Sequence, residues 1–436
     1  MTIKKEERTM DLFDLLEQKE ANEKIKESEL SRGDHIRLNS YVGSRLNTDF
    51  RTKNKKANNI KEEIDTIKDV EETKNIEIKE IKESEKVKYL KIDEDNNKEK
   101  LLIIDGSSLL STSYFARLPR QIMFAKTIEE KEQFYDKILQ TKDGIYTNGV
   151  FGFMQIMLSM IKEQKPTHLA VCLDSTRMTF RKLIYDDYKG TRKPIEVPLK
   201  EQYDLLREML ETIGVKVLIS TPSEDYSNVF EADDFAGSLS KQFQDQIPVA
   251  LYTKDEDYLQ LVDHNTVVWM NTSKATDIAK TCDINLKECN LPNNTFEYTV
   301  DLLKKVKKLK PHQIIDYKSI SGDSSDNIPG IKGLGDTTSI PLLQKYNTLE
   351  DIYKDIEGLD EKGLKLKATD WKNELGIRNP MKKLVAEKDN AFMSKQLATI
   401  KTDIDVGLTL DDLKINIDKD ILREQLDKYE MKSIKL

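Results

Sequence analysis

The sequence predicts an α/β fold with a mostly parallel sheet flanked by helices. Three short apolar runs, at residues 101–105, 168–174 and 249–255, each lead into an aspartate. Runs of this length are typical of buried parallel strands, and helix-length segments separate them here. Because ligands bind outside the carboxyl ends of such strands, we expect the three carboxylates to gather at one edge of the sheet.

The other elements of this region follow from the spacing of apolar residues. Helices are expected between successive strands, and a charged insertion interrupts the first helix-forming region. Residues 274–310 are charged and show no clear pattern. The predicted helices span 109–118, 150–161, 198–213 and 230–243, the two further strands span 215–219 and 267–270, and the insertion spans 120–142.

More acidic residues lie close to the aspartates that follow the strands. They are Glu231, Asp233, Asp234, Asp257, Asp323 and Asp326. One acid in the first turn of a helix is ordinary capping, but three within four residues exceed what capping needs. Carboxylates packed this densely stay ionised together only when cations lie between them. The sequence therefore predicts a site for hard divalent metal ions.

Basic and aromatic residues alternate in the segment at 175–197, directly after the second strand. Basic groups among aromatic rings suit a single-stranded nucleic acid, with its phosphates paired and its bases stacked. A solvated linker is the alternative, and composition alone does not separate the two. The position beside Asp174 favours the nucleic-acid interpretation.

A glycine-rich turn at 330–335 lies between helices expected at 312–320 and 337–346. Glycines at this spacing let backbone N–H groups approach a phosphate closely. This pattern predicts a helix-hairpin-helix that holds duplex DNA through its backbone without reading the sequence. Residues 351–436 are expected to be helical and charged.

The 436 residues carry a net charge of -8, which is unusual for a nucleic-acid protein. Nine of the negative charges belong to the predicted metal ligands, so the remaining surface can be basic in patches. Residues 1–99 hold 22 basic and 25 acidic residues and predict an extended or loosely helical appendage. The stretch at 11–16 is either a docking motif for a partner or a simple helix start.

Composition also limits the compartment in which the protein works. The three cysteines lack metal-ligand spacing, and their odd number fits a reducing interior. No apolar stretch approaches the length of a membrane span, and no signal peptide is evident. We expect a cytoplasmic protein without membrane contact, in the host cytoplasm if a phage encodes it.

Five motifs together resemble the 5'-nuclease family, which includes the 5'-3' exonuclease domain of bacterial DNA polymerase I, phage 5' nucleases and flap endonucleases. They are Ile104-Asp105-Gly106, Asp174 followed by Phe180-Arg181 and Tyr188-Lys189-Gly190, Glu231-Ala232-Asp233-Asp234, Thr253-Lys254-Asp255-Glu256-Asp257 and the string from Gly322 to Gly335. The resemblance covers roughly residues 100–350. It implies a PIN-like sheet, a helical arch near 175–197 and a C-terminal helix-hairpin-helix (H3TH) subdomain.

The resemblance also implies the site residues. The first metal cluster corresponds to Asp105, Asp174, Glu231, Asp233 and Asp234, and the second to Asp255, Asp257, Asp323 and Asp326. The implied catalytic cations are Lys189 and Arg192, in the arch. The implied DNA contacts are Arg181, Tyr188, Lys189, Arg192, Gly330, Lys332, Gly333 and Gly335. A potassium ion is implied at the hairpin.

We therefore expect a stand-alone, monomeric nuclease that uses two or more Mg²⁺ ions, with Mn²⁺ as a substitute. Its expected substrates are DNA with 5' ends, nicks or flaps and RNA–DNA hybrids, in replication or repair. The appendage would bind a replication protein. The expected divisions are 1–99 (appendage), 100–273 (catalytic domain), 274–350 (H3TH subdomain) and 351–436 (helical tail).

Two alternatives remain open. One is a DNA-end or junction binding protein with the same fold and little catalytic activity. The other is a ribonuclease of the PIN type, which shares an acidic edge on an α/β sheet. The intact acids argue against the first, and the glycine-rich hairpin argues against the second.

Overall fold

The structure, a computed structural model, describes residues 99–221 and 225–435. The predicted appendage, including the stretch at 11–16, lies outside the described residues apart from Glu99. None of the described helices is both long and apolar enough to cross a membrane.

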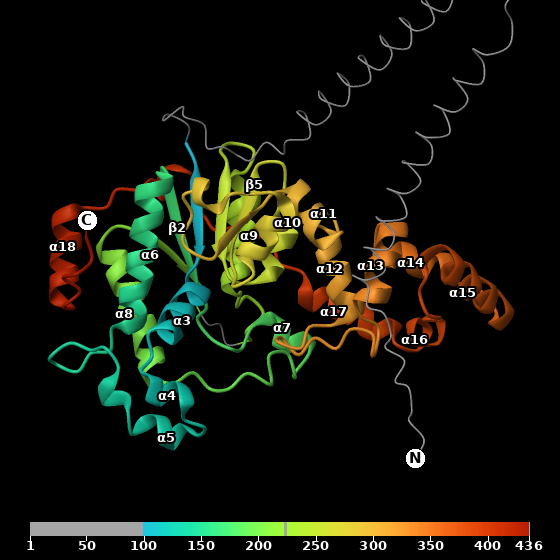
Figure 1. The fold of residues 1–436 in the computed structure, drawn as a ribbon, viewed down its shortest axis with the longest axis horizontal. Coiled ribbons are helices and arrows are strands. Elements are labelled where there is room, and N and C mark those ends of the chain that lie inside the picture. Colours follow the sequence, from blue (N-terminus) through green and yellow to red (C-terminus); the bar gives the residue numbers. More distant parts are fainter. Residues whose placement is uncertain (1–98, 222–224, 436) are drawn as a thin grey trace, which may run out of the picture. The chain divides into compact units, whose positions relative to one another are not determined.

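A six-stranded sheet forms the centre of the described chain (Figure 1). Its strand order is β3-β2-β1-β4-β5-β6, and every neighbouring pair is parallel except β5 and β6. This confirms the predicted mostly parallel sheet. The strands are β1 (Leu101–Asp105), β2 (His168–Leu173), β3 (Lys216–Ile219), β4 (Val249–Thr253), β5 (Thr266–Asn271) and β6 (Thr295–Tyr298).

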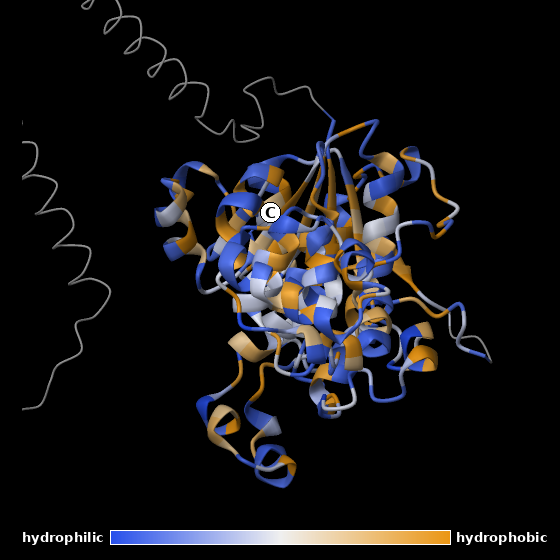
Figure 2. Cartoon of the chain, turned by 90° about the vertical axis from the view of Figure 1, so that its right-hand side faces the viewer, coloured by the Kyte–Doolittle hydropathy of each residue, from blue (hydrophilic) through white to orange (hydrophobic). Residues whose placement is uncertain are grey.

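Helices cover both faces of this sheet, because alternate side chains of each strand point to opposite sides. In β1, Leu101 and Ile103 join one hydrophobic cluster, whereas Leu102 and Ile104 join another. The strands are mainly orange in the hydropathy colouring of Figure 2. The first cluster includes α9 (Ala232–Phe243) and α10 (Ala275–Cys282), and the second includes α3 (Gly106–Ala116), α6 (Asn148–Gln164) and α8 (Val197–Thr212).

The predicted insertion at 120–142 folds into short helical pieces that project below the sheet in Figure 1. These are α4 (Arg120–Phe124), α5 (Ile128–Glu132) and η1 (Tyr135–Lys137). Lys131 of α5 forms an ion pair of 2.5 Å with Glu196. The insertion is thereby joined to the end of the basic segment at 175–197.

Residues 274–310, where the sequence showed no clear pattern, form α10, η3 (Leu286–Glu288), β6 and α11 (Val300–Lys307). After them come α12 (Gln313–Ser321), α13 (Asp336–Lys345), α14 (Leu349–Ile356), α15 (Glu361–Leu375), α16 (Met381–Ala386), α17 (Lys388–Ala398), η4 (Asp411–Leu413) and α18 (Lys419–Lys428).

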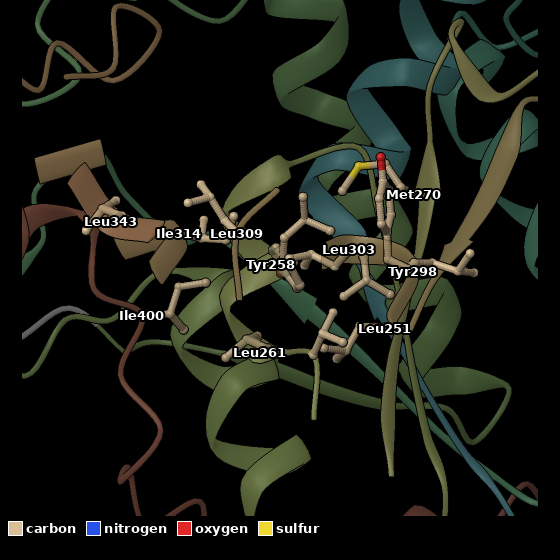
Figure 3. Packing of buried hydrophobic residues seen from close by; sticks show 14 of the residues in the cluster. Leu251, Tyr258, Leu261, Met270, Tyr298, Leu303, Leu309, Ile314, Leu343 and Ile400 are labelled. Atoms are coloured by element: carbon tan, nitrogen blue, oxygen red, sulfur yellow. The ribbon is translucent and has the colours of Figure 1, made fainter. Parts of the chain in front are cut away.

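One hydrophobic core joins the sheet to this helical region (Figure 3). It runs from Leu251 of β4 through Tyr258 of η2 (Glu256–Leu261) to Leu303 of α11, Ile314 of α12 and Leu343 of α13. Helix α12 is therefore fixed against the edge of the sheet by buried apolar contacts.

The end of the chain returns to the opposite face of the sheet. The Ile415 N–H donates to the Thr167 carbonyl at 2.9 Å, and α18 buries Leu422 and Leu426 in the cluster that contains α6 and α8. The region predicted as a helical tail therefore packs partly in the first hydrophobic cluster and partly, through α18, in the second.

The pairing of Glu297 with Trp269 predicts a pH-dependent stability. Trp269 donates its Nε1–H to Glu297 at 2.8 Å, and burial raises the pKa of Glu297 from 4.5 to about 7. Between these two pH values the folded chain keeps a proton that the unfolded chain has lost, so stability falls as pH rises. The variant Glu297→Gln keeps an acceptor without this titration. We expect it to exceed the natural chain in unfolding free energy by about 1–2 kcal/mol at pH 8.

Urea unfolding at pH 4.5 and pH 8 measures this difference. It should shrink towards zero at pH 4.5, and the exposed control Glu211→Gln should show no such dependence. An equal difference at both pH values would contradict the assignment.

Candidate functional site

Three acidic residues lie at the carboxyl ends of adjacent strands, as the sequence predicted. Strand β1 lies between β2 and β4, so Asp105, Asp174 and Asp255 follow neighbouring strand ends. Thr253 donates its hydroxyl to Asp105 Oδ2 at 2.7 Å, and the Ala232 N–H donates to Asp174 at 2.9 Å. The second bond places the start of α9 at the same edge.

The start of α9 is fixed by a reciprocal pair of caps. Glu231 is the N-cap residue, and Asp234 accepts the Glu231 backbone N–H at 3.0 Å. Asp234 is fully buried and receives two hydrogen bonds of 2.7 Å from the Arg181 guanidinium. Arg181 also donates to the carbonyls of Leu397 and Thr399. Asp234 and Arg181 therefore form a buried, bidentate ion pair, and through the carbonyls that Arg181 also binds, this pair joins α9 to the end of α17.

Three of the predicted DNA contacts are buried, with polar groups bonded inside the chain. Arg181 is 1% exposed, and its donors are taken by Asp234 and by backbone carbonyls. Tyr188 is 2% exposed and donates to Glu231 at 3.1 Å. The Gly330 N–H is bonded to Ser394. Each was predicted from composition or motif, which does not reveal that its partner lies elsewhere in the chain.

Only a small part of the predicted arch is helical. Within 175–197 the helix α7 (Phe180–Ile184) is followed by turns and irregular backbone. Lys189 takes a left-handed φ of 53°, and its Nζ lies 2.7 Å from Glu231 Oε2. Arg192 lies 2.5 Å from Asp326 Oδ1. The two cations predicted to be catalytic therefore lie against predicted metal ligands.

The second predicted cluster lies between η2 and the turn after α12. Asp255 and Asp257 flank the start of η2, and Asp323 and Asp326 follow α12. Lys318 of α12 forms ion pairs with both Asp257 and Asp323, the latter at 2.7 Å. A cavity of about 550 Å³ is lined by Asp255, Lys318 and Asp323, among others.

The two clusters differ in electrostatics. Burial raises the pKa of Asp105 to about 7, and burial with the neighbouring Asp234 raises the pKa of Asp233 well above its usual value. Burial would also raise the pKa of Asp323, but Lys318 and the hydrogen bonds from Ser325 together outweigh burial and lower that pKa to about 2. In the described part of the chain, Asp105, Asp174 and Asp233 have no ion pair within 4.0 Å.

The donor set of the first cluster fits a hard divalent cation, because it consists of carboxylate oxygens, and those of Asp105 and Asp233 form no ion pair within 4.0 Å. No three His, Cys, Asp or Glu side chains among the described residues already converge as a complete set of ligands. Hydrogen bonds to Thr253, Ser108 and Ala232 orient the carboxylates instead. In the second cluster Lys318 pairs with Asp257 and Asp323, whereas Asp255, whose pKa is raised by burial, has no ion pair among the described residues.

The glycine hairpin presents exposed backbone at the start of α13. Lys332, Gly333 and Gly335 are exposed, and Gly335 is an N-cap without a side-chain cap. The free N–H groups of the first turn favour an anion such as phosphate. Lys383, which the sequence did not single out, donates to the Gly333 carbonyl at 2.7 Å and steadies the turn from outside.

Sequence reasoning also missed Lys318. The available signal was its position, a single basic residue five places before Asp323 on a helix predicted from apolar spacing. Its side chain faces inward, and its carboxylate partners come partly from η2, 61 positions earlier in the case of Asp257. A pairing over that distance is not readable from one sequence.

Comparisons with known proteins show the family to which most of the described chain belongs. Residues 100–287 match the family model of the 5'-3' exonuclease N-terminal resolvase-like domain, and residues 309–420 match that of the 5'-3' exonuclease C-terminal SAM fold. The 5'-3' exonuclease of Aquifex aeolicus is 31% identical over 336 residues, which cover 77% of this chain and 93% of that protein.

DNA polymerase I of Caldicellulosiruptor bescii is 34% identical over 339 residues, which cover 77% of this chain. The chain spans about a third of the length of the DNA polymerase I relatives that it matches, for example 33% of this one. Among solved structures, the T5 5'-exonuclease with bound zinc is 17% identical, with 77% of this chain and 99% of that chain covered and a TM-score of 0.46.

The buried Arg181–Asp234 pair predicts a large loss of stability when only one partner is removed. Arg181→Met leaves Asp234 charged and buried without its partner, so we expect the free energy of unfolding to fall by about 3–5 kcal/mol. Urea unfolding followed by circular dichroism measures this. The exposed Arg207→Met on α8 serves as the control and should change little; a loss below about 1 kcal/mol for Arg181→Met would contradict the structural role.

Proposed function

Because the chain belongs to the 5'-3' exonuclease family, we propose that it is a divalent-metal-dependent nuclease that hydrolyses DNA phosphodiesters at 5' ends and 5' flaps. The observation that carries this proposal is that Asp105, which is buried, and Asp233, which is half-buried, lie beside Asp174 at the strand ends and form no ion pair within 4.0 Å. Such a pocket is stable with both acids ionised only when a cation enters it.

Four residues, Asp105, Asp174, Glu231 and Asp233, would hold the metal. Their oxygens suit Mg²⁺, and Mn²⁺ accepts the same ligands. When bound, the metal lowers the pKa of a coordinated water and offsets charge on the phosphate. Thr253 and Ser108 hold Asp105 in place by hydrogen bonds of 2.7 and 3.0 Å, and the Ala232 N–H does the same for Asp174.

Lys189 and Arg192 would bind the phosphate that is cleaved. Both lie on irregular backbone, and the Arg192 side chain is 45% exposed, so it can exchange Asp326 for a phosphate oxygen. Positive charge placed where negative charge develops stabilises a transition state. Histidine is not needed as a base: of the described histidines, His168 is buried in β2, whereas His264 and His312 pair with Asp263 and Asn347 away from the strand ends.

The glycine hairpin would hold the duplex beside the cleaved strand. Its exposed N–H groups and Lys332 contact phosphates without reading bases. We therefore include nicked DNA and the RNA strand of RNA–DNA hybrids among the proposed substrates, with the chain acting as a monomer in the cytoplasm. A replication protein as a partner of the stretch at 11–16, and a potassium ion at the hairpin, belong to the same proposal.

Removal of one predicted ligand should separate cleavage from binding. We expect Asp233→Asn to lower Mg²⁺-dependent cleavage of a 5'-flap duplex by at least about a thousandfold, since the metal loses a charged ligand. Binding of the same DNA should change less than threefold, because other residues contact the phosphates. The control Asp277→Asn, exposed on α10, should cleave normally. Undiminished cleavage by Asp233→Asn would overturn the assignment.

The hairpin predicts a change in the salt dependence of binding. Lys332→Ala should weaken duplex binding equally for all sequences, and the slope of log affinity against log salt should become smaller by about one. Fluorescence anisotropy at several KCl concentrations measures the slope. Lys162→Ala, exposed on α6, is the control with an unchanged slope; an unchanged slope for Lys332→Ala as well would remove the hairpin from the interface.

A further inference from the structure

Tyr258 carries a buried hydroxyl group that no other part of the described chain bonds. The residue lies on η2, directly after Asp257, and is 1% exposed. No group among residues 99–221 and 225–435 forms a hydrogen bond with its hydroxyl. Burying a hydroxyl without a partner costs free energy, whereas a phenylalanine would fill almost the same space without that cost. The hydroxyl therefore needs a physical explanation.

Tyr258 lies on the side of the sheet that carries the first cluster. It belongs to the core that Figure 3 shows, together with Leu101 and Ile103 of β1. Alternate residues of a strand point to the same face, so Asp105 ends β1 on this side. Helix α9, whose first turn holds Asp233, lies against η2. The phenol therefore comes from the core on which the first cluster is built.

The charges of the first cluster act on this phenol. Burial raises the pKa of Tyr258 well above its usual value, and Asp105 and Asp233 raise it further. Tyr258 therefore stays neutral and keeps a proton that it can donate. Hydrogen bonds to charged acceptors are shorter and stronger than those between neutral groups, so the nearby carboxylates are the acceptors that suit it best.

We propose that Tyr258 is a positioning residue of the first cluster, whose hydroxyl donates a hydrogen bond that holds the carboxylate of Asp105 or Asp233 towards a bound divalent ion. The proposal rests on the proposed nuclease function and names a residue that sets the metal affinity of its site. Asp105 also accepts from Thr253 and Ser108, whereas the described chain offers Asp233 only the N–H of its neighbour Asp234, at 2.8 Å. Groups that bond to metal ligands orient them for binding.

Two measurements on Tyr258→Phe test the proposal without any measurement of cleavage. Isothermal titration calorimetry with Mn²⁺ alone, on the full chain, should show a loss of about tenfold or more in affinity at the site that Asp233→Asn removes. In EDTA the same variant should unfold at a higher urea concentration than the natural chain, because an unpaired buried hydroxyl is gone. Unchanged Mn²⁺ affinity, or a lower urea midpoint in EDTA, would overturn the proposal.

A matched control uses a buried tyrosine whose hydroxyl already has a partner. Tyr353 of α14 is 5% exposed, and its hydroxyl donates to the Leu384 carbonyl at 2.9 Å. We expect Tyr353→Phe to unfold at a lower urea concentration and to keep the natural Mn²⁺ affinity. An equal loss of Mn²⁺ affinity in this control would contradict the assignment of the effect to Tyr258.

Two further variants keep the test decisive. If Tyr258→Phe does not fold, Tyr258→Met also lacks the donor and should show the same loss of Mn²⁺ affinity. Asp233→Asn should lose a Mn²⁺ site, and if it keeps every site, the proposed function fails and this proposal fails with it. If Asp233→Asn loses a site while Tyr258→Phe binds Mn²⁺ as the natural chain does, only the role of Tyr258 is overturned.

Discussion

Repulsion between carboxylates at one edge of the sheet is the constraint that organises this structure. Strands β2, β1 and β4 are neighbours, so the acids that follow them are forced together by topology. Burial strengthens their repulsion. Basic side chains from distant segments pair with several of these acids: Arg181 and Lys189 come from the region after β2, and Lys318 comes from α12. The folded state depends on bringing these cations to the edge.

The same ion pairs determine how the helical region meets the sheet. Arg181 links α9 to the end of α17, and Lys318 links α12 to η2. A continuous apolar core also joins the helical region to the sheet (Figure 3). Apolar burial supplies most of the attraction, while the ion pairs fix which surfaces meet, since one unpaired buried charge is costly. The same ion pairs thus belong both to the candidate site and to the contact between the sheet and the helical region.

Sequence patterns predicted the strands and most helices because the spacing of apolar residues within a short segment reflects which of its positions are buried. They failed over 274–310, where β6 is four residues long and α11 is rich in lysine, so neither carries a clear period. They placed Asp105, Asp174 and Asp255 at one edge because each follows the carboxyl end of a predicted parallel strand. They did not reveal that Arg181 and Tyr188 are buried, or that Lys318 meets Asp257, because these pairings join residues far apart in sequence.

The cations at the edge fall into two kinds, and the difference has a physical consequence. The side chains of Lys189 and Arg192 are partly exposed, and the backbone that carries them is irregular. A phosphate can therefore compete for these two cations at modest cost in conformational energy. Lys318 comes from a helix whose neighbours are buried, and releasing it would leave two acids without a partner. Displaceable charges suit substrate binding, whereas a fixed charge suits permanent neutralisation. An ammonium bound through its own chain is also present at every metal concentration, so Asp257 and Asp323 keep a counter-charge when no metal is bound.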